Sequence, residues 1–425
     1  MAKKTINKEL TGAQDLYNFL FEACNIIRGP VSQDNFKDYI TPLLYYKRIS
    51  DVYDEETEEA LISSGGDKEY ASLPEQHRFV IPDGCHWQEV RERTENFGAA
   101  IVGAMRQIEI ANPDTLYGVL SMFSSQKWTN KAILNDSKIR DLIEHLSKRK
   151  LGNKDYPADL MGDAYEILLK KFADDSKAQA GEFYTPRSVV RLLVHILDPQ
   201  PGETVYDPAC GSGGMLIEAI RYMHDDSLCC GSIFGQEKNV VNAAIAKMNL
   251  FLHGASDFNV MQGDTLRDPK ILQGGNIAKF DCVIANPPFS LENWGATEWS
   301  SDKYKRNIYG TPSDSCGDYA WIQHMICSMV SGQGRMAVVM PQGILFRNQE
   351  TEIRKQLVES DLIEAVVTLG DKLFYGTGLS PCFLIIRRMK PAHHSGRILM
   401  IDGSKILTQK RAQNILEEND IDRLY

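Results

Sequence analysis

The sequence lacks the features of a membrane-spanning or exported protein. Nowhere does it contain 18 consecutive apolar residues, and the lysines of its start, MAKKTINKEL, are not followed by an apolar stretch. It also lacks the cysteine patterns of a disulfide framework or a zinc site, because its nine cysteines are an odd number, form no CxxC pair and have no histidine cluster beside them. We therefore expect a folded cytoplasmic protein with free thiols and without a metal site.

Positive charge is also scarce. Asp and Glu number 57 against 47 Lys and Arg, which gives a formal net charge of −10. Because phosphates are bound by local positive charge, this balance excludes a chain that grips nucleic acid over its whole surface. If the substrate is DNA or RNA, another component has to help hold it. The densest run of acids, which we expect to be a solvated helix end rather than a partner site, comprises Asp51, Asp54, Glu55, Glu56, Glu58 and Glu59.

The composition is that of an ordinary globular protein, and the length of 425 residues suggests about two to three domains. Residues 1–155 are expected to form a mainly helical domain. Within 36–44, apolar residues recur at helical spacing, with Asp34 placed to cap the helix and Pro42 where a kink is expected. The basic, turn-prone stretch 147–157 marks the expected boundary.

From about residue 156 the pattern changes to short β-rich segments separated by helix-length gaps, which predicts βαβ crossovers and a mostly parallel sheet. The expected strands are 203–207, 232–237, 258–264, 280–285, 335–340, 362–368, 382–387 and 396–402. We expect the α/β domain to span 156–408 and a helical tail to span 409–425. Polar residues follow or close four of the strands, namely Asp207, Glu237, Asp264 and Asn286. Ligands of open α/β sheets bind beyond such carboxyl ends.

A glycine-rich turn follows the first expected strand. In DPACGSGG, residues 207–214, an acid precedes glycines that let the backbone approach a nucleotide-like ligand, and the helical MLIEAIRYM comes next. The turn alone is compatible with a dinucleotide site, a purely structural turn or an S-adenosylmethionine site. The acid ahead of the glycines, in place of a strict GxGxxG, favours the last. At the next two strand ends, Glu237 suits the hydroxyls of a ribose and Asp264 suits the amine of an adenine.

The motif Asn286-Pro287-Pro288-Phe289 directly follows the strand FDCVIA. Its two prolines stiffen the loop and remove two backbone donors, which leaves carbonyl oxygens pointing outward. The amino group of a base or an amide is a poor nucleophile because its lone pair is delocalised. The side-chain oxygen of Asn286 and the backbone oxygen of Pro287 are placed to accept hydrogen bonds from such a group, while Phe289 stacks on an extruded ring. The alternative is a tight turn with a core phenylalanine.

In this order, DPACGSGG and NPPF resemble the amino-methyltransferases that use S-adenosylmethionine, and GEFYTP at 181–186 is similar to the gamma arrangement of DNA adenine-N6 methyltransferases. With RGPVSQDNFKDYITPLLYYKRISDVYDEE near the N-terminus and LFYGTGLSPCFLII late in the chain, nearly the whole sequence resembles the modification subunit of type I restriction-modification systems. The resemblance implies the α/β, Rossmann-like sheet of class I S-adenosylmethionine-dependent methyltransferases, with an N-terminal helical domain and a short C-terminal helical tail.

The resemblance also implies roles for individual residues. Those expected to bind S-adenosylmethionine are Glu182, Phe183, Tyr184, Thr185, Asp207, Gly211, Ser212, Gly213, Glu237 and Asp264, the first four at its methionine end. Those expected to hold the target adenine are Asn286, Pro287 and Phe289, with Phe374 and Tyr375 as the other wall of the base pocket. Thr185 and Pro186 also have a local explanation, as the N-cap and first residue of a helix. The expected reaction is direct attack of N6 on the sulfonium methyl, which needs no metal.

Partners follow from the resemblance as well. The expected target is adenine in DNA, and a separate specificity subunit is expected to read the sequence, because no target-recognition domain follows the α/β domain. The resemblance implies two modification subunits for each specificity subunit and an optional restriction subunit. We expect 1–155 to clamp the partner or DNA and 409–425 to face the specificity subunit. The alternatives are a methyltransferase of an RNA base or of a protein glutamine amide, and an assembly module without catalysis.

Overall fold

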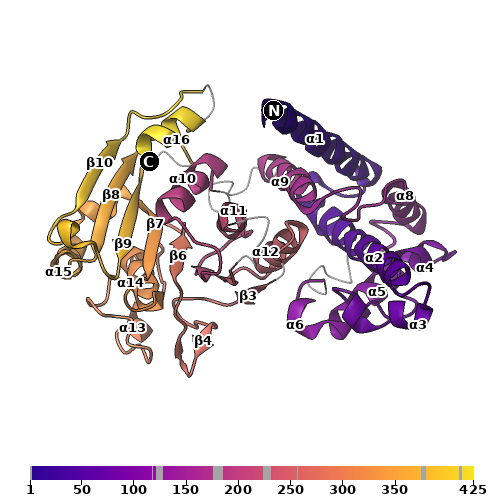
Figure 1. Ribbon diagram of the computed structural model, residues 1–425, viewed down its shortest axis with the longest axis horizontal. Helices are drawn as coiled ribbons and strands as arrows, with labels where there is room; N and C mark the ends of the chain where they lie inside the picture. Colours follow the sequence, from indigo (N-terminus) through magenta and orange to yellow (C-terminus); the bar gives the residue numbers. More distant parts are fainter. Residues whose placement is uncertain are drawn as a thin grey trace. The chain divides into compact units, whose positions relative to one another are not determined.

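The computed structural model describes residues 2–116, 118–120, 128–175, 185–223, 231–255, 257–374, 380–410 and 414–425. Contacts between residues divide the chain into two units, which Figure 1 colours along the sequence. The first comprises Met1–Ala178 with Lys247–Gly254, and the second comprises Gln179–Ala246 with Ala255–Tyr425. Within the described ranges, no helix is long and apolar enough to cross a membrane.

The first unit is helical, as the sequence predicts for the N-terminal region. Its helices are α1 (Ala2–Ile27), α2 (Lys37–Ser63), α3 (Lys68–Ala71), α4 (Trp87–Arg91), α5 (Phe97–Ala111), α6 (Pro113–Leu116), α8 (Asp136–Leu146) and α9 (Ala158–Asp175), with 3-10 turns η1 (Gln33–Asn35) and η2 (Pro74–Gln76). Residues Lys247–Gly254, which include the end of α12 (Val240–Leu252), group with these helices.

Helix α2 is buried on all sides. Every residue from Tyr39 to Val52 is buried, so the helix is covered well beyond the apolar stripe that its sequence shows. It begins at Lys37, with Phe36 in the cap position and no side-chain cap. The prediction that Asp34 occupies the cap position is therefore wrong, because Asp34 lies within the 3-10 turn η1 and Phe36 takes that position.

The charged residues of α2 bind the segment between α8 and α9. Arg48 is buried and donates a hydrogen bond to the backbone oxygen of Leu151. The Asp51 carboxylate, also buried, accepts from the backbone nitrogen of Leu151 at 2.6 Å, and Glu55 accepts from that of Asn153 at 2.6 Å. The expectation of a purely solvated acidic helix end is therefore wrong, since part of the cluster holds this segment in place.

The second unit is built on an eight-stranded sheet in the order β10-β8-β9-β7-β6-β1-β2-β3. Its strands are β1 (Val205–Asp207), β2 (Ile233–Glu237), β3 (Phe258–Gln262), β6 (Cys282–Ala285), β7 (Arg335–Pro341), β8 (Ile363–Leu369), β9 (Pro381–Arg387) and β10 (Leu399–Gly403). Each lies where the sequence predicts a strand. Neighbours pair in parallel except at β9, which is antiparallel to β7 and β8. A small hairpin of β4 (Leu272–Gln273) and β5 (Asn276–Ile277) was not predicted.

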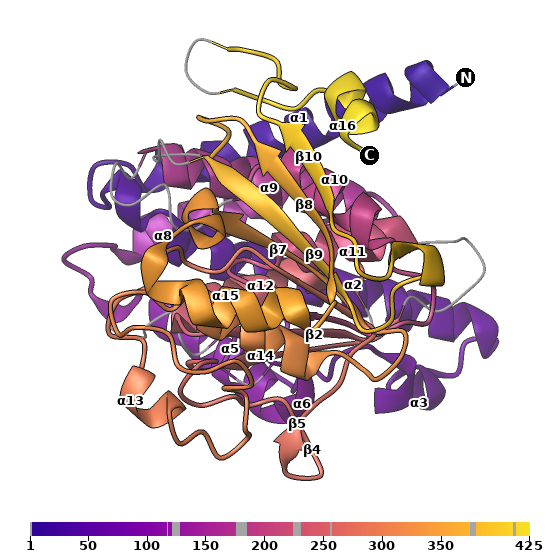
Figure 2. The ribbon, with the colours of Figure 1, turned by 90° about the vertical axis from the view of Figure 1, so that its left-hand side faces the viewer.

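Helices cover both faces of this sheet. On one face, α10 (Arg187–Leu197) contacts β7 and β6, and α11 (Gly214–Met223) contacts β1 and β2. On the other lie α14 (Asp318–Ser328) and α15 (Thr351–Glu359), as Figures 1 and 2 show. The two covered faces explain the unbroken burial along β6 and β7, which is typical of a central parallel sheet. The remaining short elements of this unit are α13 (Ala296–Trp299), η3 (Gln342–Leu345), η4 (Asn348–Glu350), η5 (Ala392–His394) and α16 (Glu418–Leu424).

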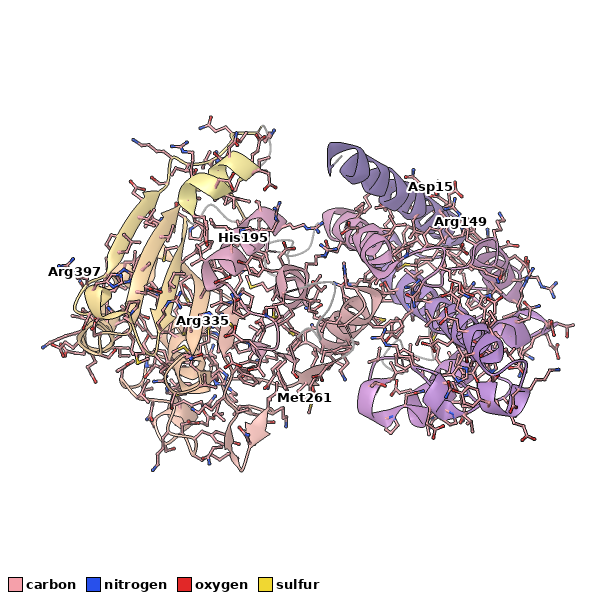
Figure 3. All side chains as sticks on the ribbon, in the orientation of Figure 1. Asp15, Arg149, His195, Met261, Arg335 and Arg397 are labelled. Carbon is pink, nitrogen blue, oxygen red and sulfur yellow. The ribbon has the colours of Figure 1, made fainter. Side chains whose placement is uncertain are left out.

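Arg335, labelled in Figure 3, fixes the amino-terminal edge of the sheet. It opens β7, and its guanidinium donates to the backbone oxygen of Leu197 at 2.6 Å and to the Glu203 carboxylate at 2.9 and 2.6 Å. These bonds tie β7 to the connection between α10 and β1.

The C-terminal tail is less helical than expected. Helix α16 begins only at Glu418, where Asp420 and Glu417 form a capping box, so the predicted helix over 409–425 is wrong for its first part. Ahead of it, Thr408 and Ile415 pair in an isolated antiparallel bridge. That bridge commits the backbone to an extended form that a helix cannot share.

Candidate active site

Four polar strand ends meet at one edge of the sheet. The strands β6, β1, β2 and β3 are consecutive parallel neighbours, so their carboxyl ends lie side by side. Asp207 closes β1, Glu237 closes β2, Asn286 follows β6, and Asp264 follows shortly after β3. The structure thus brings these four residues to one edge.

The turn after β1 is fixed by hydrogen bonds but stays open at Gly211. Asp207 is 2% exposed and accepts a hydrogen bond from the backbone nitrogen of Ala209 at 2.9 Å, and burial raises the pKa of its carboxyl to about 8. Gly211 and Gly213 have φ angles of +53° and +85°, which other residues rarely adopt. A Cβ built on Gly211 would meet no atom of a described residue within 4 Å, so this part of the chain leaves room for a ligand against the backbone. Ser212 lies between the two glycines in the same turn.

Glu237 links this turn to the next strand. One carboxylate oxygen accepts from the backbone nitrogen of Gly211 at 3.0 Å, and the other accepts from that of Asn239 at 2.6 Å. Burial raises the pKa of the Glu237 carboxyl. The backbone of Lys238 also donates to this carboxylate, so about one of its four acceptor sites is left for the hydroxyl of a ribose.

Asp264 already has partners that sequence reasoning missed. Its Oδ1 accepts from the backbone nitrogens of Leu266 and Arg267, both at 3.2 Å, and its Oδ2 forms an ion pair with Lys238 Nζ at 2.9 Å. The Lys238 side chain is 71% exposed, so the pair lies at the surface. The only signal in the sequence is that Lys238 directly follows Glu237 at a strand end. An adenine amine has to share Asp264 with this lysine or displace it.

The side-chain amide of Asn286 has a hydrogen-bond partner at its nitrogen but none, among the described residues, at its oxygen. Its Nδ2 donates a hydrogen bond to Thr185 Oγ1 at 2.8 Å. Its Oδ1 is buried and accepts no hydrogen bond from any residue that the structure describes. Leaving a buried acceptor without a donor costs about 1–3 kcal/mol, so such an oxygen is a mark of a binding site for a donor.

The Thr185 hydroxyl bonds to Asn286 and does not form the helix cap that the sequence suggests. Helix α10 begins at Arg187, with Pro186 in the cap position and no side-chain cap. The prediction that Thr185 is the N-cap and Pro186 the first helical residue is wrong. A residue before proline avoids the helical region, which keeps Thr185 extended and leaves its hydroxyl to Asn286.

The far end of the NPPF loop is held by a buried acid that the sequence reasoning also missed. Ser290 has a φ of +50°, and its backbone nitrogen donates to Asp318 Oδ1 at 2.7 Å. The other oxygen of Asp318 pairs with Arg347 Nη2 at 2.6 Å, and Arg347 Nε donates to Glu350 at 2.9 Å. Asp318 opens α14 and Arg347 follows β7, so two distant elements fix the loop in which Phe289 lies.

The aromatic residues of the expected base pocket are partly described. The rings of Phe289 and Phe374 lie 6.3 Å apart at 57°, and Phe374 is buried. Pro287 is buried as well. Glu182, Phe183, Tyr184 and Tyr375 lie outside the described residues. Among the residues that are described, no group of three or more His, Cys, Asp or Glu could hold a metal ion.

Known families match both parts of the chain. The family model described as N-6 DNA Methylase matches residues 156–425, and the one described as HsdM N-terminal domain matches residues 16–146. The fold is also that of a putative class I S-adenosylmethionine-dependent methyltransferase from Listeria monocytogenes, with a TM-score of 0.50, 16% identity and coverage of 71% of this chain and 92% of that one. The sheet, its glycine turn and the family match over 156–425 therefore define the class, the α/β fold of the class I methyltransferases.

Individual relatives narrow the class. The MjaVII methylase subunit of a type I restriction enzyme from Methanocaldococcus jannaschii is 34% identical over 90% of this chain and 67% of its own length. The EcoKI methylase subunit from Escherichia coli K12 is 27% identical over 86% of this chain and 65% of its own length. The crystal structure of a type I restriction-modification methyltransferase subunit from Streptococcus thermophilus has a TM-score of 0.82 and 25% identity, and the match covers 97% of this chain and 92% of that one.

The chain belongs to the N-6 DNA methylase family, as a modification subunit of the type I restriction-modification kind. It is thus an adenine-specific DNA methyltransferase, and subunits of this kind act in complexes with a specificity subunit and DNA. The alternatives of an RNA-base or glutamine methyltransferase and of a non-catalytic module are not supported by these relatives.

Proposed function

We propose that this chain methylates N6 of an extruded adenine with Asn286, Pro287 and Phe289 as the residues that hold the base. The observation that carries the proposal is the side chain of Asn286, whose amide nitrogen is bonded to Thr185 while its buried oxygen has no donor among the described residues. An adenine amino group is the kind of donor that this oxygen lacks.

The residues at the sheet edge fit S-adenosylmethionine. Among the described residues, Gly211 leaves open space against the backbone, and the Glu237 carboxylate lies beside it, bonded to the Gly211 backbone nitrogen. We propose that the residues holding it are Asp207, Gly211, Ser212, Gly213, Glu237 and Asp264, with Glu182, Phe183 and Tyr184 at the methionine end. Thr185, which the resemblance places there as well, accepts a hydrogen bond from Asn286 instead. When bound, S-adenosylmethionine supplies a methyl group made electrophilic by the sulfonium.

The chain's own contribution is to aim the amino group. Asn286 Oδ1 and the Pro287 backbone oxygen accept its two N–H bonds, which draws the nitrogen toward tetrahedral geometry and directs its lone pair away from the ring. The same oxygens face the positive charge that develops on nitrogen, so they stabilise the transition state more than the ground state. Phe289 stacks on the flat base and excludes water. The N–H protons would become acidic only as the nitrogen is methylated, so no general base would be needed beforehand, and the proton would pass to solvent as the product leaves the site.

Sequence recognition is proposed to belong to a separate specificity subunit that brings two copies of this chain to one DNA site, with a restriction subunit as an optional addition. In this arrangement, 1–155 clamps the partner or DNA, 156–408 carries out catalysis and 409–425 faces the specificity subunit. The cytoplasm is the proposed compartment, since the substrate is DNA and the described cysteines are free.

Transfer of a labelled methyl group tests this proposal. The chain is purified with and without its co-expressed specificity subunit and incubated with S-adenosylmethionine carrying a tritiated methyl group and with plasmid DNA from a host that lacks the system. We expect label in DNA, recovered as N6-methyladenine, only when the specificity subunit is present. Label in RNA or protein, or cofactor binding by the complete complex without transfer, would overturn it.

A further inference from the structure

The amide of Asn286 can be turned by half a rotation with almost no change of shape, and only one orientation suits catalysis. The side chain has an oxygen that accepts hydrogen bonds at one end and an NH2 that donates two at the other. If the NH2 end faced the adenine amino group, two donors would oppose each other. The protein therefore needs an acceptor for the NH2 end, which stabilises the orientation in which the oxygen faces the base.

The group that does so is on a segment far from the motif in sequence. Thr185 Oγ1 lies 2.8 Å from Asn286 Nδ2 and accepts its hydrogen bond. Both residues belong to the second unit, with Thr185 just ahead of α10 and Asn286 just after β6. Pro186 holds Thr185 outside the helix, so its hydroxyl is not consumed by a helix cap.

We propose that Thr185 is a positioning residue for methyl transfer, which acts by accepting the amide hydrogen bond of Asn286 and so allows Asn286 Oδ1 to face the substrate amine. The inference rests on the proposed function, and it gives Thr185 a role different from the expected enclosure of the cofactor. A hydroxyl can donate or accept, so the apoprotein tolerates either orientation of the amide. Once the adenine amine occupies Oδ1, only the orientation in which Thr185 accepts satisfies every group.

The cost of removing this acceptor sets the expected effect. In Thr185→Val, which has nearly the same shape, the Asn286 NH2 loses its partner whenever the oxygen faces the base. An unsatisfied buried donor costs about 1–3 kcal/mol, which corresponds to roughly a 10- to 100-fold fall in kcat. The affinity for the cofactor should stay unchanged, because the hydrogen bond that is lost belongs to Asn286 and not to the cofactor.

The test compares three variants in the complete complex with the specificity subunit. Thr185→Val should lower kcat by roughly 10- to 100-fold with the Kd for S-adenosylmethionine and the KM for DNA nearly unchanged, and Thr185→Ser, which keeps the hydroxyl, should recover most of the rate. The control is Thr204→Val, the same change at the opposite edge of the sheet, where the Thr204 hydroxyl donates to Asp281 at 2.7 Å. It should leave kcat as it is.

Two results would overturn this inference. If Thr185→Val raises the cofactor Kd while single-turnover transfer at saturating cofactor is normal, Thr185 binds the cofactor and does not position Asn286. If Thr185→Ser is as slow as Thr185→Val, the methyl group and not the hydroxyl matters. Asn286→Ala separates this failure from failure of the proposed function, since retained turnover by Asn286→Ala would contradict the proposed role of Asn286 itself.

Discussion

Asp207 carries a buried carboxyl whose ionisation is unfavourable in the folded chain. Burial raises its pKa from 3.8 to about 8, and the neighbouring Glu237 adds to the effect. A folded-state pKa above the unfolded one means that stability is present at low pH and is lost as the pH rises through about 8. We therefore expect the urea midpoint of the chain without cofactor to fall between pH 5 and pH 8, and Asp207→Asn to reduce that fall.

A matched acid with the opposite shift serves as the control for Asp207. Hydrogen bonds from Lys390, Gly396 and Ser395 lower the pKa of Asp361 to about 2, so its contribution is lost only in strong acid. Asp361→Asn should change the midpoint equally at pH 5 and pH 8. A wild-type midpoint that stays level over this range would contradict the account of Asp207.

Gly211 should matter first for the cofactor. Its φ of +53° disfavours any side chain, and a β-branched one would also fill the open space against the turn. The strain of about 1–2 kcal/mol lowers the stability of the fold, whereas the valine side chain takes up space that the cofactor needs, so Gly211→Val should weaken binding of S-adenosylmethionine by roughly tenfold or more in calorimetry. Gly65→Val, at a glycine of the first unit with a φ of +70° and similarly open space, should leave cofactor affinity unchanged. Equal effects of both changes on cofactor affinity would show that the turn plays no special part.

For single residues, the sequence predicted which side chains lie at the strand ends better than it predicted which other residues they bond to. The residues Asp207, Glu237 and Asn286 lie at strand ends because strand periodicity and glycine placement are local signals. Asp318 could not be predicted, because its bond to Ser290 depends on where α14 begins in space. Lys238 was missed for the same reason, since its pairing with Asp264 joins two neighbouring strand ends.

Close packing between helices in the first unit gives a prediction at the scale of elements. A Cβ on Gly162, inside α9, would lie about 2.0 Å from the buried His253 ring. A Cβ on Gly103, inside α5, would meet no described residue within 4 Å. Alanine is normally the better helix residue by roughly 1 kcal/mol. We expect Gly103→Ala to raise the unfolding midpoint of the chain and Gly162→Ala to lower it, as measured by thermal melting. Similar shifts in both variants would mean that α9 and His253 are not in close contact.

The eight strands of the sheet were all predictable, but the pairing of β9 was not. Its sequence, PCFLIIR, is as apolar as that of the parallel strands, because it is buried between β7 and β8. The direction of a buried strand leaves no mark on its composition. The acidic end of α2 was misjudged because its partners lie about a hundred residues further along the chain. Long-range pairing of this kind is invisible to local periodicity.

The net charge of −10 is a property of the whole molecule, and it determines how the chain binds DNA. A chain with this balance should bind DNA weakly by itself, with a Kd of about 10⁻⁴–10⁻⁶ M at physiological salt and a steep loss as salt rises. Addition of the specificity subunit should tighten binding to about 10⁻⁸ M or better at the recognised site. Fluorescence anisotropy with a labelled duplex at two salt concentrations, with and without that subunit, checks this. Tight, salt-insensitive binding by the chain alone would contradict it.

The central claim is that methyl transfer depends on the side-chain oxygen of Asn286. The most direct test is single-turnover transfer by the complete complex carrying Asn286→Ala, with cofactor affinity measured on the same sample. Loss of a preorganised group of this kind costs roughly 100- to 1,000-fold, so transfer should fall at least that far while the Kd for S-adenosylmethionine stays within a few fold. Asn276→Ala, in the hairpin of β4 and β5, is the control and should transfer normally. Undiminished transfer by Asn286→Ala would contradict the account.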